Sequence, residues 1–373
     1  MAGIYVHIPY CRKACHYCDF HFSTTLRSMP DMVGALVSEI ERRGAQPLWR
    51  ETTFSTVYFG GGTPSVMSTE QLKTVVSALR SRFNILPNAE FTLEANPDDL
   101  TPEKLDALLQ LGVNRLSVGI QSFHATDLSW MNRAHGADEA LAVIPNIRRA
   151  GFSNFTIDLI YGLPIWMGDE WERNLQIAMD FEVPHLSCYI LTVEPGTVLG
   201  HQVKKKQITL LDEAIPAQYN LLCERTKQAG YEHYEVSNFA RKGARSQHNG
   251  SYWKGLPYVG IGPGAHGFSG NTRYANITSN TGYIRAAGDA ETHEELTLND
   301  RYNELIMTRL RTSEGLNIDE CLAQFGRTPA DVDAATYHRY LQEGVLAQEN
   351  GCVRVAEKAW LMGDRIASDF FWV

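Results

Sequence analysis

Residues 4–18 read IYVHIPYCRKACHYC, an apolar run followed directly by three cysteines within eight positions. The run at Ile4–Ile8 is typical of a strand, so Cys11, Cys15 and Cys18 lie on the loop that follows it. Three thiolates on one short loop can hold three irons of a 4Fe–4S cluster and leave the fourth iron open to a non-protein ligand, whereas closed clusters use four cysteines. The pattern predicts that Cys11, Cys15 and Cys18 are metal ligands.

A zinc ion is the alternative occupant of this loop, with His7, His16 or His21 as a further ligand. Zinc sites favour a pair of cysteines two to four positions apart together with a distant second pair, and the sequence has no second pair. An iron–sulfur cluster is therefore favoured over a zinc-stabilised binding module.

The first half of the chain alternates strand-like and helix-like segments. Strands are expected where apolar, β-branched or aromatic residues run together, at Ile4–Ile8, Thr56–Phe59, Glu90–Ala95, Arg115–Gly119, Phe155–Tyr161 and His185–Thr192. Helices are expected where apolar residues recur at three- and four-residue intervals, at Met32–Arg43, Gln71–Arg82, Pro102–Leu111, Ala137–Ala150 and Glu170–Asp180. Thr69 and Thr101 are the predicted helix caps. Six such units predict an α/β fold with a mostly parallel sheet, which a partial barrel and an open doubly wound sheet both fit.

Polar residues gather at the carboxyl ends of these strands. Gly60–Thr63 follows the second strand, and its glycines let the backbone approach a ligand closely. Glu94 ends the third strand, Gln121 follows the fourth, and Arg133 lies on the loop beyond it. Asp158 lies in the apolar fifth strand, where an unpaired carboxylate is costly, so it needs a hydroxyl or ammonium partner such as a ribose or an arginine. Because barrels of parallel strands form their sites at the carboxyl ends, we expect a ligand at this edge.

The spacing Cys-x3-Cys-x-aromatic-Cys, with Tyr17 at the aromatic position, resembles the signature of the radical S-adenosylmethionine (SAM) superfamily. In that superfamily SAM binds the open iron, and an electron from the reduced cluster cleaves it to a 5′-deoxyadenosyl radical and methionine. The whole chain is similar to the coproporphyrinogen III dehydrogenase-like branch, which implies a partial (β/α)6 radical SAM barrel. By that resemblance Tyr17 packs on the adenine and Tyr5 supports the cluster end. The remaining residues that the resemblance places around SAM are Gly61, Gly62, Thr63, Glu94, Gln121, Arg133 and Asp158.

Two further segments are expected beyond the barrel, which covers residues 1–195. Residues 196–293 are too long and too aromatic for a flexible linker and indicate a structured extension. Residues 294–373 change to helices such as Thr328–Glu343 and a short hairpin around Asn350-Gly351. This order predicts a small winged-helix-like α+β module.

Two groups within this branch are similar, the oxygen-independent coproporphyrinogen III dehydrogenases of heme synthesis and the heme chaperones HemW. The segment His248-Asn249-Gly250-Ser251-Tyr252-Trp253 resembles the His-Asn-x-x-Tyr-Trp motif of the chaperones. Phe20 stands where the dehydrogenases carry a further cysteine, and the first strand begins at Ile4, without the N-terminal extension expected of them. An imidazole can ligate heme iron, so the resemblance implies heme binding by His248, with His266 as a second candidate. Without the resemblance, the motif fits a turn that anchors the extension to the barrel.

Composition and charge limit the classes of partner and the cellular location that the sequence predicts. The net charge of −9 argues against sequence-independent binding to nucleic acid, and we expect no DNA binding by the C-terminal module. No apolar stretch approaches the roughly 18 residues of a transmembrane helix, and the start lacks the features of a signal peptide. Seven cysteines, three of them clustered, indicate a reducing compartment, so a cytoplasmic location is expected. The other cysteines are interpreted as packing residues, and they are Cys188, Cys223, Cys321 and Cys352.

Together these patterns predict a heme-binding protein that contains a 4Fe–4S cluster and SAM and hands heme to acceptor proteins. Peripheral membrane contact through the acceptors and a homodimer are compatible with this prediction. The alternative function is decarboxylation of coproporphyrinogen III by the dehydrogenase. The sequence is compatible both with an enzyme that turns over SAM and with a chaperone that does not.

Overall fold

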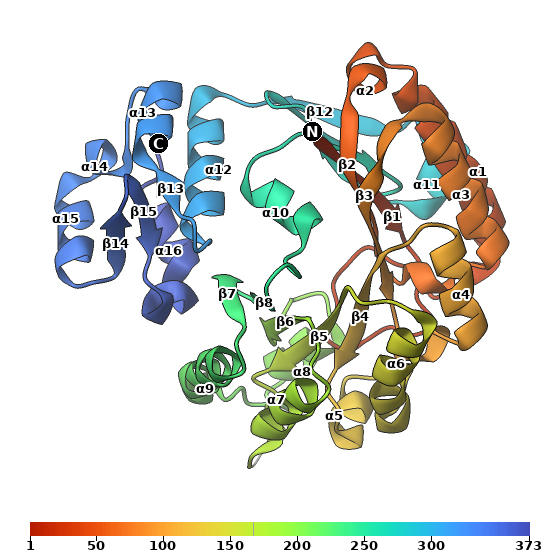
Figure 1. Cartoon of the computed structure of the whole chain (residues 1–373), viewed down its shortest axis with the longest axis horizontal. Coiled ribbons are helices and arrows are strands. Elements are labelled where there is room, and N and C mark those ends of the chain that lie inside the picture. Colours follow the sequence, from red (N-terminus) through yellow and green to blue (C-terminus); the bar gives the residue numbers. More distant parts are fainter. Residues whose placement is uncertain (167) are drawn as a thin grey trace.

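A mixed sheet runs through the molecule (Figure 1), and within the described residues it has twelve strands. The computed structural model describes residues 1–166 and 168–373. In spatial order the strands are β12 (Glu291–Glu295), β11 (Thr272–Asn276), β10 (His266–Phe268), β9 (Tyr258–Ile261), β1 (Ala2–Ile8), β2 (Thr53–Gly61), β3 (Asn84–Ala95), β4 (Arg115–Gln121), β5 (Phe155–Tyr161), β6 (His185–Ile190), β8 (Asn238–Ala240) and β7 (Glu232–Glu235). Strands β1 to β6 pair in parallel, which confirms the predicted α/β fold.

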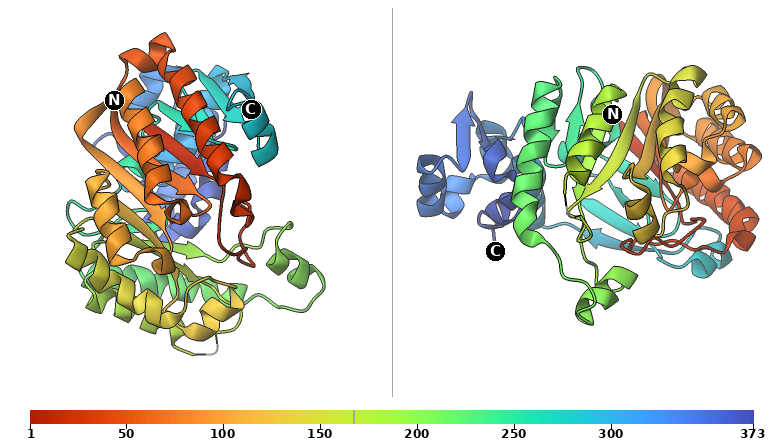
Figure 2. Two further views of the ribbon diagram at one scale, coloured as in Figure 1. Left: turned by 90° about the vertical axis from the view of Figure 1, so that its right-hand side faces the viewer. Right: turned by 90° about the horizontal axis from the view of Figure 1, so that it is seen from below.

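Helices follow the parallel strands and cover one side of the sheet (Figures 1 and 2). They are α1 (Met29–Gly44), α2 (Pro47–Glu51), α3 (Thr69–Arg82), α4 (Pro102–Gln110), α5 (Ala125–Trp130), α6 (Ala137–Ala150) and α7 (Glu170–Asp180). In α1 the side chains of Met32, Leu36 and Ile40 are fully buried. Their spacing of four residues puts them on one helix face, which packs on the sheet.

Helix ends follow local capping chemistry. Thr101 caps α4 as predicted, because its hydroxyl accepts from the backbone N–H of Lys104 at 3.2 Å. The predicted cap at Thr69 was wrong by one residue. Ser68 caps α3 and forms a reciprocal pair of hydrogen bonds with Gln71, which leaves Thr69 as the first helical residue.

The extension widens the sheet at both edges. Its helices are α8 (Val198–Lys204), α9 (Ile215–Gln228), α10 (Gln247–Trp253) and α11 (Asn280–Arg285). Strand β9 pairs in parallel with β1, and β8 pairs antiparallel with β6. The strands of the extension are only three to five residues long, too short for a periodic pattern to reveal them in the sequence.

A buried ion pair joins the extension to α1. Arg43 donates from Nε to Glu39 Oε1 at 2.7 Å, and both side chains are at most 1% exposed. Arg43 also donates to Asn276 at 3.1 Å and forms an ion pair with Glu291, and both of these partners belong to the extension. The second oxygen of Glu39 accepts from the backbone N–H of Gly262 at 2.8 Å. Each buried charge thus has several partners, as burial requires.

The C-terminal module contains helices and a small three-stranded sheet in the order β13-β15-β14. Its elements are α12 (Leu298–Leu310), β13 (Leu316–Asn317), α13 (Ile318–Phe325), α14 (Pro329–Val332), α15 (Ala334–Gln342), β14 (Leu346–Glu349), β15 (Cys352–Val355), a 3-10 helix at Glu357–Met362, and α16 (Gly363–Ser368). The expected single helix over Thr328–Glu343 is wrong. Asp333 adopts an extended backbone, which ends α14, and its side chain caps α15. Within the described residues no helix is long and apolar enough to cross a membrane.

We expect Arg43→Met to lower the free energy of unfolding by about 3–5 kcal/mol, because buried Glu39 would lose its closest cation and keep only Arg42 at 3.8 Å. Urea unfolding followed by circular dichroism measures this loss. The matched control is Arg82→Met, since Arg82 pairs with Glu41 at 3.3 Å and both side chains are about half exposed. That change should cost less than about 1 kcal/mol. Equal losses in the two variants would contradict a structural role for the buried pair.

Candidate functional site

The cysteine loop leaves the carboxyl end of β1 and is held by the loops that follow neighbouring strands. Arg12 donates from Nε to Asp99 Oδ1 at 2.7 Å, and the other oxygen of Asp99 accepts from the Ser65 hydroxyl at 2.7 Å. The side-chain amide of Asn132 donates to the carbonyl oxygen of Ala14 at 2.8 Å. The position of the loop therefore depends on the connections after β2, β3 and β4.

The three thiols lie in a polar, partly exposed setting. Thr63 Oγ1 donates to Cys11 Sγ at 3.4 Å, and Arg133 Nη1 donates to Cys15 Sγ at 3.3 Å. Burial, together with the neighbouring Cys18 and Cys15, raises the pKa of Cys11 to about 11, although the hydrogen bond from Thr63 opposes the rise. A cation is needed to hold such a group as a thiolate, and iron ions would supply that charge.

The spacing of these sulfurs bears on the choice between zinc and a cluster. Among residues 1–166 and 168–373, the one group of three metal-ligating side chains with all ligand atoms within 4.8 Å of one another is Cys223, His233 and Glu357. The cysteine loop thus does not gather its three sulfurs around one point, as a single zinc ion requires. A 4Fe–4S cluster binds each sulfur through a different iron and suits wider spacing.

The glycine loop after β2 packs tightly against the end of β1. Gly61 has a φ of +110°, and a Cβ there would lie 2.6 Å from the imidazole of His7. A Cβ on Gly62 would lie 2.6 Å from the carbonyl oxygen of Tyr10. Only glycine fits these two positions. The loop then presents the backbone N–H of Gly61 to Glu94 Oε2 at 3.1 Å.

Two buried carboxylates, Glu94 of β3 and Asp158 of β5, interact electrostatically at this edge of the sheet. Glu94 accepts from the Tyr58 hydroxyl at 2.7 Å, and burial together with the charge of Asp158 raises its pKa to about 7. Burial likewise raises the pKa of Asp158 to about 6, although hydrogen bonds from Ser187 and Ser117 oppose the rise. The protein thus supplies hydroxyl partners for Asp158. Both carboxylates would gain from a ligand that carries positive charge or hydroxyl groups.

Arg133 reaches from its loop into the same edge. Its Nη2 donates to Asn96 Oδ1 at 2.8 Å and to the carbonyl oxygen of Gly119 at 2.7 Å, while its buried Nε has no partner. Burial raises the pKa of Tyr17, and the adjacent Arg133 charge opposes that rise. Gln121 adopts a left-handed backbone with φ of +67°. Such strain in a residue other than glycine is typical of functional sites.

Tyr58 is a residue of this site that the sequence analysis missed. Its hydroxyl binds Glu94, and its ring stacks on Tyr5 at a centroid distance of 6.1 Å. Tyr5 in turn forms a hydrogen bond with His7 Nδ1 at 3.0 Å. The sequence did contain a signal for this role. Tyr58 stands among the apolar residues of a buried strand, and a buried phenol hydroxyl needs a hydrogen-bond partner.

The His-Asn-x-x-Tyr-Trp segment forms α10, and His248 lies inside the barrel with 2% of its surface exposed. Nδ1 of His248 forms a hydrogen bond with Thr56 Oγ1 at 2.8 Å, and Nε2 forms one with the Tyr252 hydroxyl at 2.9 Å. Its ring stacks on Tyr58 at 4.9 Å. Both ring nitrogens are therefore engaged, and bonding to iron would require the release of one partner. His266 lies exposed on β10.

The structure thus brings most predicted site residues to one edge. Direct contacts link Cys11 to Thr63, Cys15 to Arg133, and Gly61 to Glu94. The donor set suits a cluster at the thiols. The carboxylates and the unpaired Arg133 Nε suit the amino, carboxylate and hydroxyl groups of an amino-acid nucleoside such as SAM.

If Cys11, Cys15 and Cys18 are the ligands, alanine at any one of them should abolish the cluster. Anaerobic reconstitution should give about four irons and four sulfides per wild-type chain, and near zero in each variant. Cys188→Ala is the control, because this buried cysteine lies on β6 away from the loop. Full iron and sulfide content in any single loop variant would contradict the ligand assignment.

Glu94→Gln should change both ligand affinity and the pH dependence of stability. Between a pKa of 4.5 unfolded and about 7 folded, only the folded chain holds the proton. The free energy of unfolding therefore falls as pH rises, by up to about 1.4 kcal/mol per pH unit. A glutamine cannot ionise, so the fall should flatten in the variant, measured by urea unfolding without SAM.

Calorimetry with the cluster present should show SAM affinity reduced roughly ten- to a hundredfold in Glu94→Gln and in Asp158→Asn, with the cluster retained. The control Glu70→Gln changes an exposed carboxylate on α3 and should leave both measurements as in the wild type. Unchanged SAM affinity in folded variants would remove these carboxylates from the site.

Comparisons with known proteins place this geometry in a family. The model of the radical SAM superfamily matches residues 5–178, and that of the HemN C-terminal domain matches residues 296–362. The solved structure of coproporphyrinogen III oxidase (HemN) from Escherichia coli superposes with a TM-score of 0.85 and 23% identity, covering 99% of this chain and 90% of that one. This likeness confirms the radical SAM fold over the whole chain.

The relatives found by sequence identify the family more narrowly than the fold does. The heme chaperone HemW of Bacillus subtilis is 31% identical over 99% of both chains. The heme chaperone HemW of Mycobacterium tuberculosis is 35% identical over 84% of this chain and 82% of its own. That of Escherichia coli is 32% identical over 87% of this chain and 86% of its own. The chain therefore belongs to the HemW family of the radical SAM superfamily.

Proposed function

We propose that this protein is a heme chaperone that binds heme and delivers it to acceptor proteins. Membership of the radical SAM superfamily implies a 4Fe–4S cluster and SAM. Relatives that align over 87% and 99% of the chain carry the name heme chaperone. Cys11, Cys15 and Cys18 would hold the cluster, and when reduced such a cluster supplies one electron to bound SAM.

The residues around the strand ends would hold SAM in the following way. Glu94 and Asp158 accept hydrogen bonds from its amino and hydroxyl groups, and Arg133 places a positive charge beside the thiolates. Tyr17 offers an aromatic face to the adenine. The other residues of this proposed SAM site are Tyr5, Gly61, Gly62, Thr63 and Gln121.

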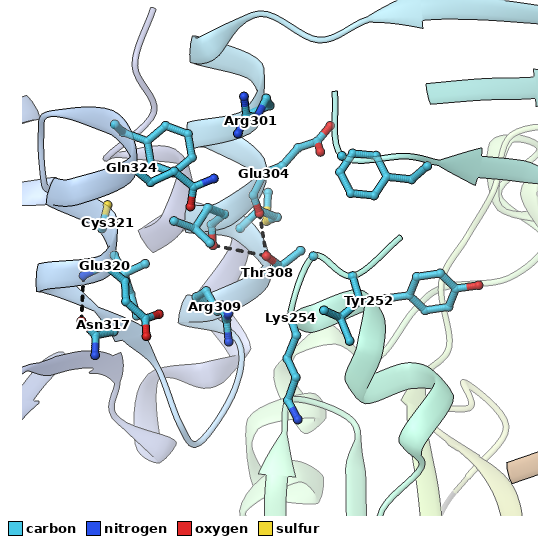
Figure 3. Close-up of a pocket in the computed structure, with 18 of the residues that line it drawn as sticks. Tyr252, Lys254, Arg301, Glu304, Thr308, Arg309, Asn317, Glu320, Cys321 and Gln324 are labelled. Carbon is cyan, nitrogen blue, oxygen red and sulfur yellow. Dashed lines mark hydrogen bonds between the residues drawn. The ribbon is translucent and has the colours of Figure 1, made fainter. Parts of the chain in front are cut away.

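The observation that carries heme binding is a pocket of about 560 Å³ between the extension and the C-terminal module. Figure 3 shows Tyr252 and Lys254 on one side of the pocket and Arg301 of α12 on the other. The rings of Tyr258 and Phe268 also line it. Heme presents a flat apolar macrocycle and two carboxylates, so aromatic faces combined with cations are complementary to it. The volume lies within the roughly 300–1,000 Å³ typical of small-molecule sites.

The chaperone motif contributes to this pocket through Tyr252, which lines it, whereas His248 lies behind Tyr252 and binds its hydroxyl. His248 therefore supports heme binding in one of two ways. It releases Tyr252 and ligates the iron, or it keeps Tyr252 in place while another group ligates. The exposed His266 is a second candidate ligand.

Decarboxylation of coproporphyrinogen III is the competing function, and the fold alone does not exclude it because HemN shares that fold. Phe20 stands at the position of the additional dehydrogenase cysteine, and its side chain is 68% exposed. A phenylalanine side chain has no thiol, so it cannot perform the chemistry of a cysteine at that position. We therefore propose heme transfer without decarboxylation.

Titration of the cluster-containing protein with heme, followed by difference spectra in the Soret region, tests the proposal. Arg301→Ala should weaken heme affinity roughly tenfold or more, because it removes a charge-assisted hydrogen bond to a propionate. Arg149→Ala is the control, since Arg149 is exposed on α6 of the barrel. An affinity equal to the wild type in Arg301→Ala would place heme elsewhere.

The same titration separates the two roles of His248. If His248 ligates iron, His248→Ala shifts the Soret maximum and Tyr252→Phe does not. If His248 only positions Tyr252, both variants lower affinity and neither shifts the maximum. A double variant with His266→Ala shows whether the second histidine masks the effect. Anaerobic conversion of coproporphyrinogen III with SAM and a reductant would overturn the chaperone proposal.

A further inference from the structure

Cys223 of α9, His233 of β7 and Glu357 of the C-terminal module form a compact group far from the cysteine loop in sequence. Their ligand atoms all lie within 4.8 Å of one another. In the right-hand view of Figure 2, the green helix α9 lies between the C-terminal module and the barrel. The group therefore sits where the extension meets the module. The sequence analysis interpreted Cys223 as a packing residue, since it stands apart from other cysteines in the sequence. His233 and Glu357 come from other segments of the chain, so no local pattern joins them to Cys223.

The hydrogen bonds around His233 indicate what a metal ion would replace. Nε2 lies 3.3 Å from the carbonyl oxygen of Val236, which can only accept, so Nε2 is a donor. Nδ1 faces Glu357 Oε1 at 2.9 Å and Cys223 Sγ at 3.8 Å. A carboxylate also only accepts, so Nδ1 donates a hydrogen to Glu357 when no metal is bound. If a metal ion takes the place of that hydrogen, three electron-pair donors converge on it, from Cys223, His233 and Glu357.

The distance between the thiol and the imidazole suits a metal ion. Zinc binds sulfur at about 2.3 Å and nitrogen at about 2.0–2.1 Å, which puts the two ligand atoms about 3.5 Å apart in a tetrahedral site. The separation of 3.8 Å between Cys223 Sγ and His233 Nδ1 is close to that value. A catalytic cysteine–histidine–acid relay would use the two ring nitrogens for different partners, whereas here both partners face Nδ1.

The surroundings hold the imidazole in one orientation. The His233 ring stacks on Phe239 at 4.0 Å and meets Trp360 edge-on at 4.3 Å. Tyr219 lies one helical turn before Cys223 on α9, and its buried hydroxyl interacts with the sulfur of Cys223. It is placed to donate to a metal-bound sulfur, as outer groups of metal sites do.

We propose that Cys223, His233 and Glu357 bind one zinc ion that joins the C-terminal module to α9 and β7. A thiolate, an imidazole and a carboxylate are the ligand types that zinc takes in proteins. Glu357 is 50% exposed, so water can complete the tetrahedron from the solvent side. The zinc would hold α9 and β7 of the extension against the C-terminal module, and this role is independent of the proposed heme transfer.

Zinc-edge X-ray absorption on the full-length, cluster-reconstituted protein tests the proposal, since this measurement detects zinc alone. After zinc loading and dialysis we expect about one zinc per chain, with one sulfur at about 2.3 Å and nitrogen or oxygen ligands at about 2.0–2.2 Å. Zinc bound in the cysteine loop would instead show several sulfurs, which overturns the assignment.

Variants of Cys223 and Glu357 then test whether these residues bind the zinc. Cys223→Ser and Glu357→Gln should each lower zinc affinity, measured by competition with a chelator. We expect a loss of more than about 100-fold for Cys223→Ser, since losing even an outer partner costs about 10- to 100-fold. Cys352→Ser and Glu349→Gln are matched controls on the hairpin of the same module. Unchanged affinity in the ligand variants, or no zinc in the wild type, overturns the proposal and leaves an imidazolium–carboxylate pair.

Discussion

The parallel register of the central strands determines where the strand residues of the proposed cluster and SAM site lie. Ile8 at the end of β1 pairs with Gly61 of β2, and Glu94 of β3 pairs with Ser117 of β4. The same register continues into β5, where Asp158 pairs with Gly119 of β4, and it brings Asp158 to the same edge. A shift by one residue would turn each of these side chains to the opposite face, because strand side chains alternate. The cysteine loop, which starts where β1 ends, can meet them only in this register.

Polar groups at this edge are kept at a cost to the stability of the ligand-free fold. The carboxylates of Glu94 and Asp158 have raised pKa values because burial penalises their charges. Gln121 holds a left-handed backbone, and the Nε of Arg133 is buried without a partner. A fold selected for stability alone would place apolar residues here. These costs are concentrated where a charged, hydroxyl-rich ligand would offset them, as functional sites typically do.

Aromatic contacts connect the two proposed binding regions. Tyr5 stacks on Tyr58, Tyr58 on His248, and His248 meets Tyr252 edge-on at 5.0 Å. Tyr252 in turn contacts Tyr258 at 4.6 Å, and these two tyrosines line the pocket shown in Figure 3. The chaperone motif thus anchors the extension to the barrel and also forms a wall of the pocket. The anchoring role and the proposed role in heme binding thus belong to two faces of the same short helix, α10.

Local patterns determined the six parallel strands, five of the barrel helices, the cysteine loop and the set of polar residues at the strand ends, because each depends on neighbours within a few residues. The same patterns did not reveal β9 beside β1, the break at Asp333, or the partners of His248. Nor did they join Cys223 to Glu357. These features depend on contacts between distant segments, whose free energy comes from burial and from hydrogen bonds that form only when the whole sheet is assembled. The sequence by itself therefore determined the chemistry available to this protein, and the tertiary structure decided which of those groups are buried, paired or free, because only packing sets the environment of a side chain.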